Sequence, residues 1–96
     1  MKFMLTWSSF PETRHDAYKG FAQMTDAEDE ADHPGVKLIG RWHDIVACGG
    51  MLICESDDIS AVQSFALNWS GVLNIEVRPV VDDNEAKTML KRKWNL

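Results

Sequence analysis

The sequence has little positive charge and no extended basic segment, which excludes one broad class of function. Its 96 residues include 10 Lys and Arg against 15 Asp and Glu, so the net charge is −5. Nucleic-acid binding needs clustered cations that neutralise phosphates, whereas the one basic cluster here, Lys91-Arg92-Lys93, is three residues long. Such a cluster is typical of a helix C-terminus, where cations complement the helix dipole. We therefore expect no nucleic-acid partner.

Long apolar runs are missing as well. No segment approaches the ~20 consecutive apolar residues of a bilayer-spanning helix, and the apolar run at Met1–Trp7 is too short for a secretory signal. The chain has only two cysteines, which fits a reducing compartment. We expect a cytoplasmic protein without a membrane partner.

The few cysteines and histidines do not form a disulfide or metal pattern. Cys48 and Cys54 fall in one expected strand, about 20 Å apart at ~3.3 Å per residue, which is too far for a disulfide or a shared metal. His15, His33 and His43 lack the H-x-x-x-H spacing of a metal site. Only His15 is placed as a candidate haem ligand. We predict no metal and no cofactor.

The residues that are present form the pattern of one small domain over residues 1–96. Hydrophobic residues make up 45% of the chain and include four Trp. Alternating apolar residues predict strands, and apolar residues at helical spacing after Asp caps predict helices. The expected strands are Lys2–Trp7, Val36–His43, Val46–Glu55 and Val72–Val81, and the expected helices are Glu12–Met24, Ile59–Trp69 and a last one from Asp82 through Trp94. The acidic segment 25–32 indicates a fraying helix end or a solvated loop, and it lacks the spacing of a calcium loop.

This order predicts a β-α-β-β-α-β core over residues 1–81 and a C-terminal helix over 82–96. Two right-handed crossovers around a hairpin give an α+β fold of the ferredoxin-like type, with a four-stranded antiparallel sheet and helices on one face. The other face of such a sheet stays uncovered, so we expect a second copy to cover it. The predicted partner is therefore the protein itself, as a homodimer.

Three blocks of the chain resemble a known family. They are Met1–Trp7 (MKFMLTW), Gly40–His43 (GRWH) and Glu76–Asp83 (EVRPVVDD). Together they are similar to an uncharacterised family of small bacterial domains of unknown function, whose members look like dimeric α/β barrel proteins of the ferredoxin-like superfamily. The resemblance implies that two sheets pair face to face as a dimeric α/β barrel, with a cavity between each sheet and its helices. The superfamily includes cofactor-free monooxygenases, muconolactone isomerase-like enzymes, haem-binding proteins and stress-induced proteins, and none of their catalytic motifs carries over to this chain.

Aromatic side chains supply the first candidate site. Trp7 and Trp42 end the first two strands and are expected on the face that also carries Leu38, while Trp69 ends the helix over 59–69. If that face lies against the helices, the three indoles converge. With Phe21 from the first helix, they predict a wall for a flat apolar ligand; the alternative is that they fill the core.

Arg41 and His43 flank Trp42 and supply the second candidate site. Strict alternation places both on the face opposite Trp42, unless a β-bulge reverses it. His43 is the candidate general acid or base, because the pKa of His lies near neutrality, and Arg41 is the candidate to hold a carboxylate or an enolate oxygen. The alternatives are a hydrogen-bonded structural His43 and an ion pair made by Arg41. The acids weighed for that pair are Asp44, Glu55 and Glu76.

Three functions stay open from the residues alone. The first is a homodimer that binds a small, largely apolar molecule between sheet and helices. The second is a cofactor-free oxygenase or isomerase-like enzyme that uses His43 and Arg41. The third is a structural or protein-interaction dimer whose contact surface is the acidic segment 25–32 or the C-terminal helix.

Overall fold

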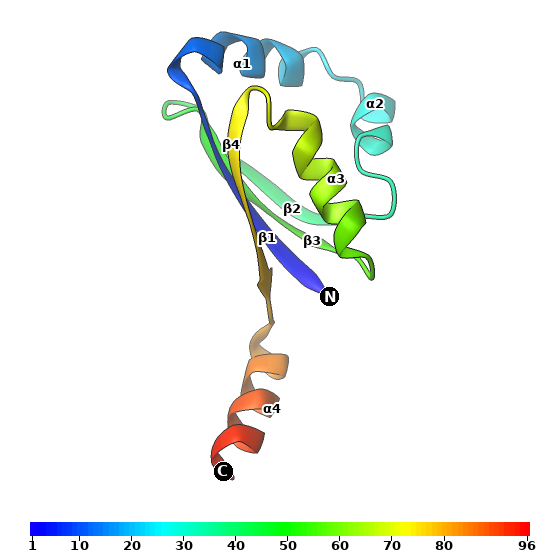
Figure 1. The fold of residues 1–96 in the computed structure, drawn as a ribbon, viewed down its shortest axis with the longest axis vertical. Coiled ribbons are helices and arrows are strands. Elements are labelled where there is room, and N and C mark those ends of the chain that lie inside the picture. The colour runs from blue at the N-terminus through cyan, green and yellow to red at the C-terminus, as the bar shows by residue number, and fades with distance from the viewer.

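The computed structural model, which describes residues 1–96, contains four strands and four α-helices (Figure 1). They are β1 (Lys2–Ser9), a 3-10 turn η1 (Pro11–Thr13), α1 (Arg14–Ala22), α2 (Asp26–Ala31), β2 (Lys37–Asp44), β3 (Gly49–Glu55), α3 (Ile59–Trp69), β4 (Leu73–Val80) and α4 (Asp83–Trp94). All neighbouring strands pair antiparallel, in the order β2-β3-β1-β4. The predicted α+β class and the four-stranded antiparallel sheet are confirmed.

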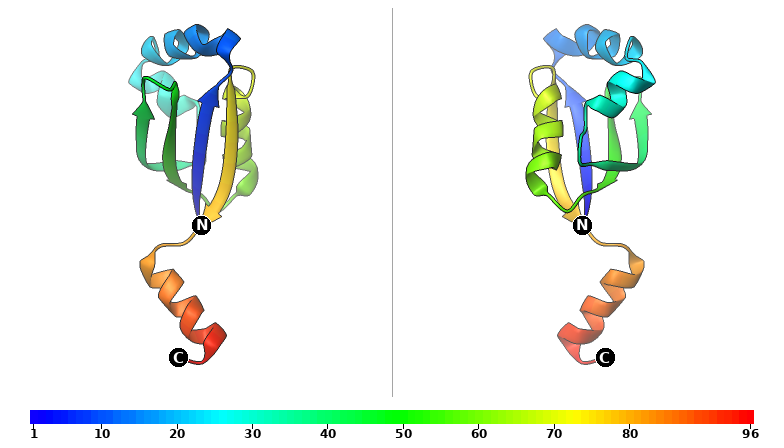
Figure 2. Two further views of the ribbon diagram at one scale, coloured as in Figure 1. Left: turned by 90° about the vertical axis from the view of Figure 1, so that its left-hand side faces the viewer. Right: turned by 90° about the vertical axis from the view of Figure 1, so that its right-hand side faces the viewer.

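Helices cover one face of the sheet and leave the other without a layer. In Figure 2, α2 and α3 lie against one face, α1 crosses one end of the strands, and nothing lies on the opposite face. The core lies between the sheet and the helices and consists of Phe3, Leu5, Val36, Leu52, Cys54, Val62 and Phe65. Only 10 of the 96 residues are buried. Much of the hydrophobic surface of the chain is therefore still exposed to solvent.

Side-chain caps set where the helices begin. Asp58 caps α3 and Asp82 caps α4, as the sequence predicts. The acidic segment forms a separate helix, α2, instead of a frayed end or a loop, because Thr25 and Glu28 form a capping box. None of the helices combines the length and the apolar character needed to cross a membrane.

A β-bulge interrupts the pairing of β2 with β3. Leu38 pairs with Cys54 and Gly40 pairs with Ile53, so Ile39 is an extra residue between two consecutive pairs. Because successive side chains of a strand point to opposite faces, one inserted residue reverses the facing of all that follow.

The bulge overturns the expected facing of the residues after position 39. Arg41 and His43 point toward the helices, while Trp42 lies on the opposite side with 59% of its surface exposed. The prediction from strict alternation had them the other way round. Gly40 makes room for the outward indole, because a Cβ at position 40 would collide with the ring of Trp42. We call this uncovered side of the sheet, which carries Met4, Trp42, Met51 and Ile53, the bare face.

The connection between β2 and β3 is a tight turn. The expected third strand starts three residues too early, because β3 begins at Gly49. Ala47 N donates to Asp44 Oδ1 at 3.2 Å, and Cys48 N donates to Ile45 O at 3.3 Å. Cys48 also has a φ of 50°, which no strand residue adopts. The apolar residues Ile45 and Cys48 thus lie in a turn and not in a strand, and both line the space between the sheet and the helices.

Candidate functional site

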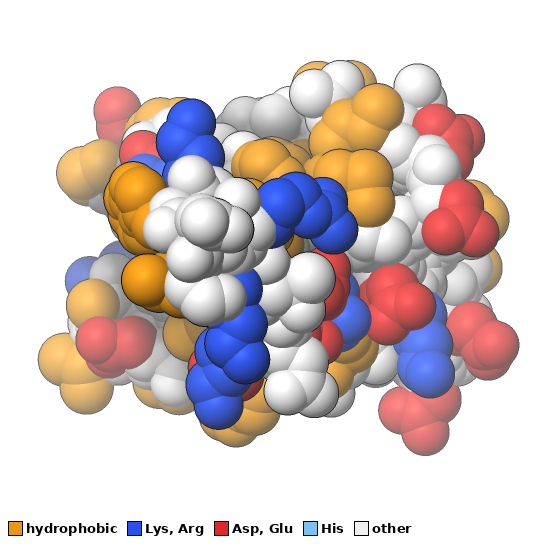
Figure 3. Space-filling view, turned by 90° about the horizontal axis from the view of Figure 1, so that it is seen from below, with side chains coloured by type: hydrophobic (Ala, Val, Ile, Leu, Met, Phe, Trp, Pro, Cys, Tyr) orange, Lys and Arg blue, Asp and Glu red, His pale blue; other side chains and the backbone are white.

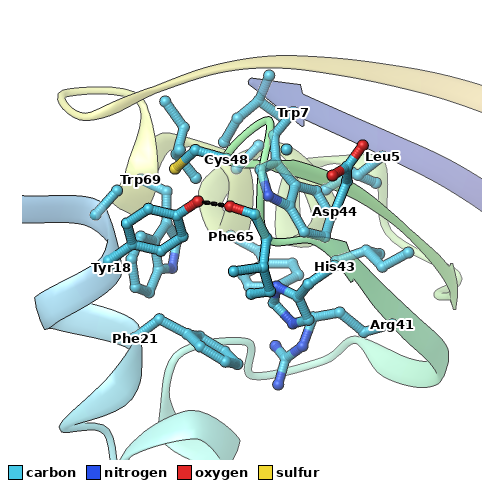
Figure 4. Close-up of a pocket in the computed structure, with 17 residues that line it drawn as sticks. Leu5, Trp7, Tyr18, Phe21, Arg41, His43, Asp44, Cys48, Phe65 and Trp69 are labelled. Carbon is cyan, nitrogen blue, oxygen red and sulfur yellow. Dashed lines mark hydrogen bonds between the residues drawn. The ribbon is translucent and has the colours of Figure 1, made fainter. Parts of the chain in front are cut away.

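A pocket of about 100 Å³ lies between the sheet and the helices α1 and α3 (Figure 4). Of its 17 lining residues, 13 are hydrophobic, and the charged or titratable groups among the remainder are Arg41, His43 and Asp44. An apolar pocket with a few converging polar groups is the common form of a small-molecule site. This pocket is therefore the candidate functional site.

Three of the four aromatic residues predicted as a ligand wall line the pocket. Trp7 comes from β1, Phe21 from α1 and Trp69 from the end of α3. The indole of Trp69 is fixed by a hydrogen bond from Nε1 to Asp32 Oδ2 at 2.7 Å. Trp42, the fourth, lies on the bare face because of the bulge at position 39, and it does not contribute to the pocket.

The imidazole of His43 lies among the aromatic rings of the pocket wall. Its ring centroid is 4.6 Å from that of Phe21 and 5.6 Å from that of Trp7, with Trp7 edge-on. Partial burial lowers the pKa of His43 below its usual value of 6.5, and the charge of Arg41 lowers this pKa further. The one hydrogen bond drawn in Figure 4 joins Tyr18 to Ile45. No lining residue in that view is hydrogen-bonded to the ring nitrogens of His43. A pKa below 6.5 favours the neutral imidazole at neutral pH.

Arg41 pairs with Asp29 of α2. Nη1 lies 3.1 Å from Oδ1 and Nη2 lies 2.8 Å from Oδ2, a two-point contact between largely covered side chains. The hydrogen bonds from Arg41 hold the pKa of Asp29 below its usual value, against the opposing effect of burial. The guanidinium also lies over the ring of Phe21, 4.9 Å from its centroid. The positive charge at the pocket is therefore largely neutralised by a protein carboxylate.

This partner of Arg41 differs from the acids expected from the sequence. The sequence offers Asp44, Glu55 and Glu76 as partners, and strict alternation places Arg41 on the face opposite Trp42. Because the bulge turns Arg41 toward the helices, it meets α2 instead. The signal that could have located Asp29 is the capping-box spacing within the acidic segment, which places a short helix beside the sheet.

Helix α1 forms the roof of the pocket and is held mainly by polar contacts. Tyr18 Oη donates to Ile45 O, and Arg14 Nη2 donates to Val46 O, so both anchors reach the β2–β3 turn. Ala17 is the only buried residue of α1. The pocket is already open to solvent beside this helix, where Phe21, His43 and Ile45 are exposed.

The remaining candidate groups lie outside this arrangement. His15 is exposed on α1 and does not line the pocket. His33 Nδ1 lies 2.9 Å from Val36 O and its ring packs on Phe65, which is a structural role. Cys54 is fully buried, and burial raises the pKa of its thiol. No group of three or more His, Cys, Asp or Glu side chains is placed to hold a metal ion.

Comparisons with known proteins place the chain in a family and assign no activity to it. Neither the curated proteins nor the solved structures contain a significant match to this sequence. One family model matches residues 1–93, nearly the whole chain. The protein belongs to the family described as Domain of unknown function (DUF3303).

Proposed function

We propose that this protein is a homodimer that binds a small, largely apolar molecule in the pocket beneath α1. The observation that carries the proposal is the pocket itself, with 13 hydrophobic residues among 17. Its volume of about 100 Å³ is somewhat below the ~150 Å³ of an engineered cavity that accepts benzene. The ligand is therefore about the size of a single six-membered ring.

The polar groups of the pocket narrow the chemistry of the ligand. His43 is neutral and offers one donor and one acceptor nitrogen, while Arg41 is already bound to Asp29. A neutral ring that carries one hydroxyl or carbonyl group can hydrogen-bond to His43 and pack against the aromatic side chains of the pocket wall, Trp7 and Phe21 among them. A strongly anionic ligand is a poorer fit, because it would have to displace Asp29 from Arg41.

Titration with benzene, phenol and cyclohexanol tests the proposal, with tryptophan fluorescence and ligand-observed NMR as the readouts. Phenol is expected to bind more tightly than benzene, because it adds a hydrogen bond to His43. Ala66→Phe fills the pocket from α3 and should abolish binding. The matched control is Leu67→Phe at the next position, whose side chain is 69% exposed and outside the pocket. Equal binding by the two folded variants would overturn the proposal.

The homodimer is supported by the bare face. Trp42 and its neighbours Met51 and Ile53 form an apolar patch among charged residues, on a sheet face that no helix covers. A second copy would bury this patch. Sedimentation equilibrium measures this directly. A monomer at all concentrations would refute the homodimer. The proposal that the pocket binds a ligand would then still be decided by the titration.

Proton transfer by His43 is a second candidate function, and the bulge is the observation that favours it. The bulge places the imidazole of His43 on the wall of a largely apolar pocket, where it can accept a proton from a carbon next to a carbonyl group and return it to another carbon. Such an isomerase needs no cofactor. The test is hydrogen–deuterium exchange into cyclohexenone in D₂O, followed by NMR. Exchange that is lost in His43→Gln supports catalysis, and unchanged exchange in that variant contradicts it.

A further inference from the structure

Helix α2 contacts two side chains of the pocket wall without reaching the pocket itself. None of its residues lines the pocket, and none is buried. Asp29 within the helix and Asp32 at its C-cap are three residues apart, so they lie on the same side of α2. Asp29 pairs with Arg41 of β2, and Asp32 accepts a hydrogen bond from Trp69 at the end of α3. Both of these partners line the pocket, so α2 acts on the pocket wall from behind.

The two contacts occupy hydrogen-bond donors of the pocket wall. An indole has a single donor, and Asp32 accepts it from Trp69 at 2.7 Å. Asp29 accepts one hydrogen bond from each terminal nitrogen of Arg41, at 3.1 and 2.8 Å. Each acid therefore reduces what the wall can offer to a polar ligand, and Asp29 also neutralises a charge.

The charge of Arg41 is the larger of these effects, because its guanidinium belongs to the pocket. Figure 4 shows the guanidinium beside Phe21 and His43, and its carbon lies 4.9 Å from the centroid of the Phe21 ring. The positive charge of Arg41 lowers the pKa of the His43 imidazole, so it acts on groups within the pocket. The side chains of Arg41 and Asp29 are only 20% and 27% exposed. A cation covered to this extent binds another anion when its partner is removed.

The negative charge of the whole molecule is a second, less specific source of discrimination against anions. The net charge is −5. In Figure 3, seen from the end opposite α1, acidic side chains gather toward the right-hand side, where Figure 1 draws α2 and α3. Salt screens the field of exposed charges over about 10 Å at 0.1 M, whereas a covered pair is screened much less. A test must therefore separate the contact made by Asp29 from the field of its exposed neighbours.

We propose that Asp29 makes the pocket selective for neutral ligands, because it neutralises Arg41 from outside the pocket, and that its loss turns the pocket into a site for a ring with a carboxylate group. Asp29 does not line the pocket, so it acts on the ligand only through Arg41 and is a positioning residue. This selectivity rests on the proposed function, since it takes the pocket beneath α1 as the ligand site.

Benzamide and benzoate test the proposal, because they have nearly the same shape and only benzoate is charged at neutral pH. The wild-type protein is expected to bind benzamide about tenfold more tightly than benzoate. In Asp29→Asn, the affinity for benzoate should rise about tenfold or more, through charge-assisted hydrogen bonds to Arg41, and the affinity for benzamide should stay within about threefold. Ligand-observed NMR and tryptophan fluorescence measure both affinities.

Three further variants isolate the contact between Asp29 and Arg41. Glu30→Gln removes the same charge from an exposed position of α2 and should leave the ratio of the two affinities within about threefold of the wild-type ratio. Asp29→Glu keeps a carboxylate within reach of Arg41 and should retain the wild-type preference. Arg41→Gln added to Asp29→Asn should abolish the gain in benzoate binding. A role of Asp29 in folding alone would weaken both ligands together and leave their ratio unchanged.

Failure of this selectivity is distinguishable from failure of the pocket. Equal effects of Asp29→Asn and Glu30→Gln on benzoate binding would overturn the role of Asp29 and leave the pocket as a ligand site. Wild-type protein that binds benzoate as tightly as benzamide would overturn it as well, and that measurement does not depend on the folding of any variant. Wild-type protein that binds neither benzamide nor phenol would refute both the selectivity and the proposed ligand site.

Discussion

Arg41 is the residue through which α2 is joined to the sheet, because its guanidinium holds both carboxylate oxygens of Asp29. The same guanidinium lies over the ring of Phe21 in α1. One side chain of β2 therefore positions parts of both short helices beside the pocket. Removal of the Arg41 side chain is therefore expected to weaken the packing of both helices beside the pocket.

Replacing Asp29 tests this link. Asp29→Asn should lower the free energy of unfolding at neutral pH by about 1 kcal/mol, because it breaks a charge-assisted pair that is only partly exposed. The pKa of Asp29 is lowered in the folded protein, so the pair stabilises the fold above the unfolded pKa of 3.8 and this contribution is lost as the pH falls through the lower folded pKa. Urea unfolding at about pH 7 and about pH 3 measures both effects.

The control for this prediction is Glu30→Gln, an exposed substitution in the same helix that makes no ion pair. It should change the free energy of unfolding by less than about 0.5 kcal/mol. If Asp29→Asn and Glu30→Gln have equal effects, the pair with Arg41 contributes nothing measurable.

The titration of His43 should report its place in the pocket. NMR titration of the ring is expected to give a midpoint below 6.5, because burial and then the charge of Arg41 both disfavour the imidazolium. Since the folded protein binds this proton less readily than the unfolded chain, His43 makes the fold less stable as the pH falls from 6.5 through the lower folded pKa. Arg41→Gln should raise the midpoint, and Lys37→Gln, an exposed cation of the same strand, should leave it unchanged. A wild-type midpoint at or above 6.5 would contradict the geometry.

Gly50 should tolerate no side chain. A Cβ at position 50 would meet the backbone oxygen of Trp42 and the indole of Trp7, so Gly50→Ala is expected to destabilise the fold by about 1–3 kcal/mol. The matched control is Gly71→Ala, where nothing lies within 4 Å of a Cβ and φ is not positive, and its effect should stay within about 0.5 kcal/mol. Thermal unfolding of the two variants decides between them.

Cys48 occupies a left-handed backbone conformation, with a φ of 50°. That conformation costs an ordinary residue about 1–2 kcal/mol and costs glycine little. Cys48→Gly should therefore be more stable than Cys48→Ala by about 1 kcal/mol, although both remove the same thiol from the pocket wall. Urea unfolding compares them, and an alanine variant at least as stable as the glycine variant would show that the turn relaxes.

Local patterns predicted the elements well and their facing less well. The alternation in β1 and β4 and the Asp caps of α3 and α4 involve neighbours in sequence, so they are readable from the chain. Residues 46–48 were predicted as the start of a strand because they are apolar, whereas the hydrogen bonds of the turn and the positive φ of Cys48 end the turn only at Gly49. The partner of Arg41 depends on the path of α2, which is a tertiary property.

The aromatic wall shows the same limit within the candidate site. Trp7, Phe21 and Trp69 meet because β1, α1 and α3 each present them on the side that their own periodicity indicates. Trp42 does not join them because its facing depends on an irregularity at Ile39 that no residue type announces. Apolar periodicity predicts which side chains share a face of a regular strand, but it does not predict where a β-bulge interrupts the pairing.

The unpaired residue in β2 has a consequence for how this fold can vary. A chain shortened by Ile39 alone would keep its strands and its composition, yet it would turn an indole inward and send the cation and the imidazole outward. The two surfaces of the sheet would then exchange these three side chains, and an indole would stand beside the pocket in place of the guanidinium and the imidazole. The number of residues in β2, rather than the choice of any side chain, decides whether Arg41 and His43 or Trp42 face the pocket beneath α1.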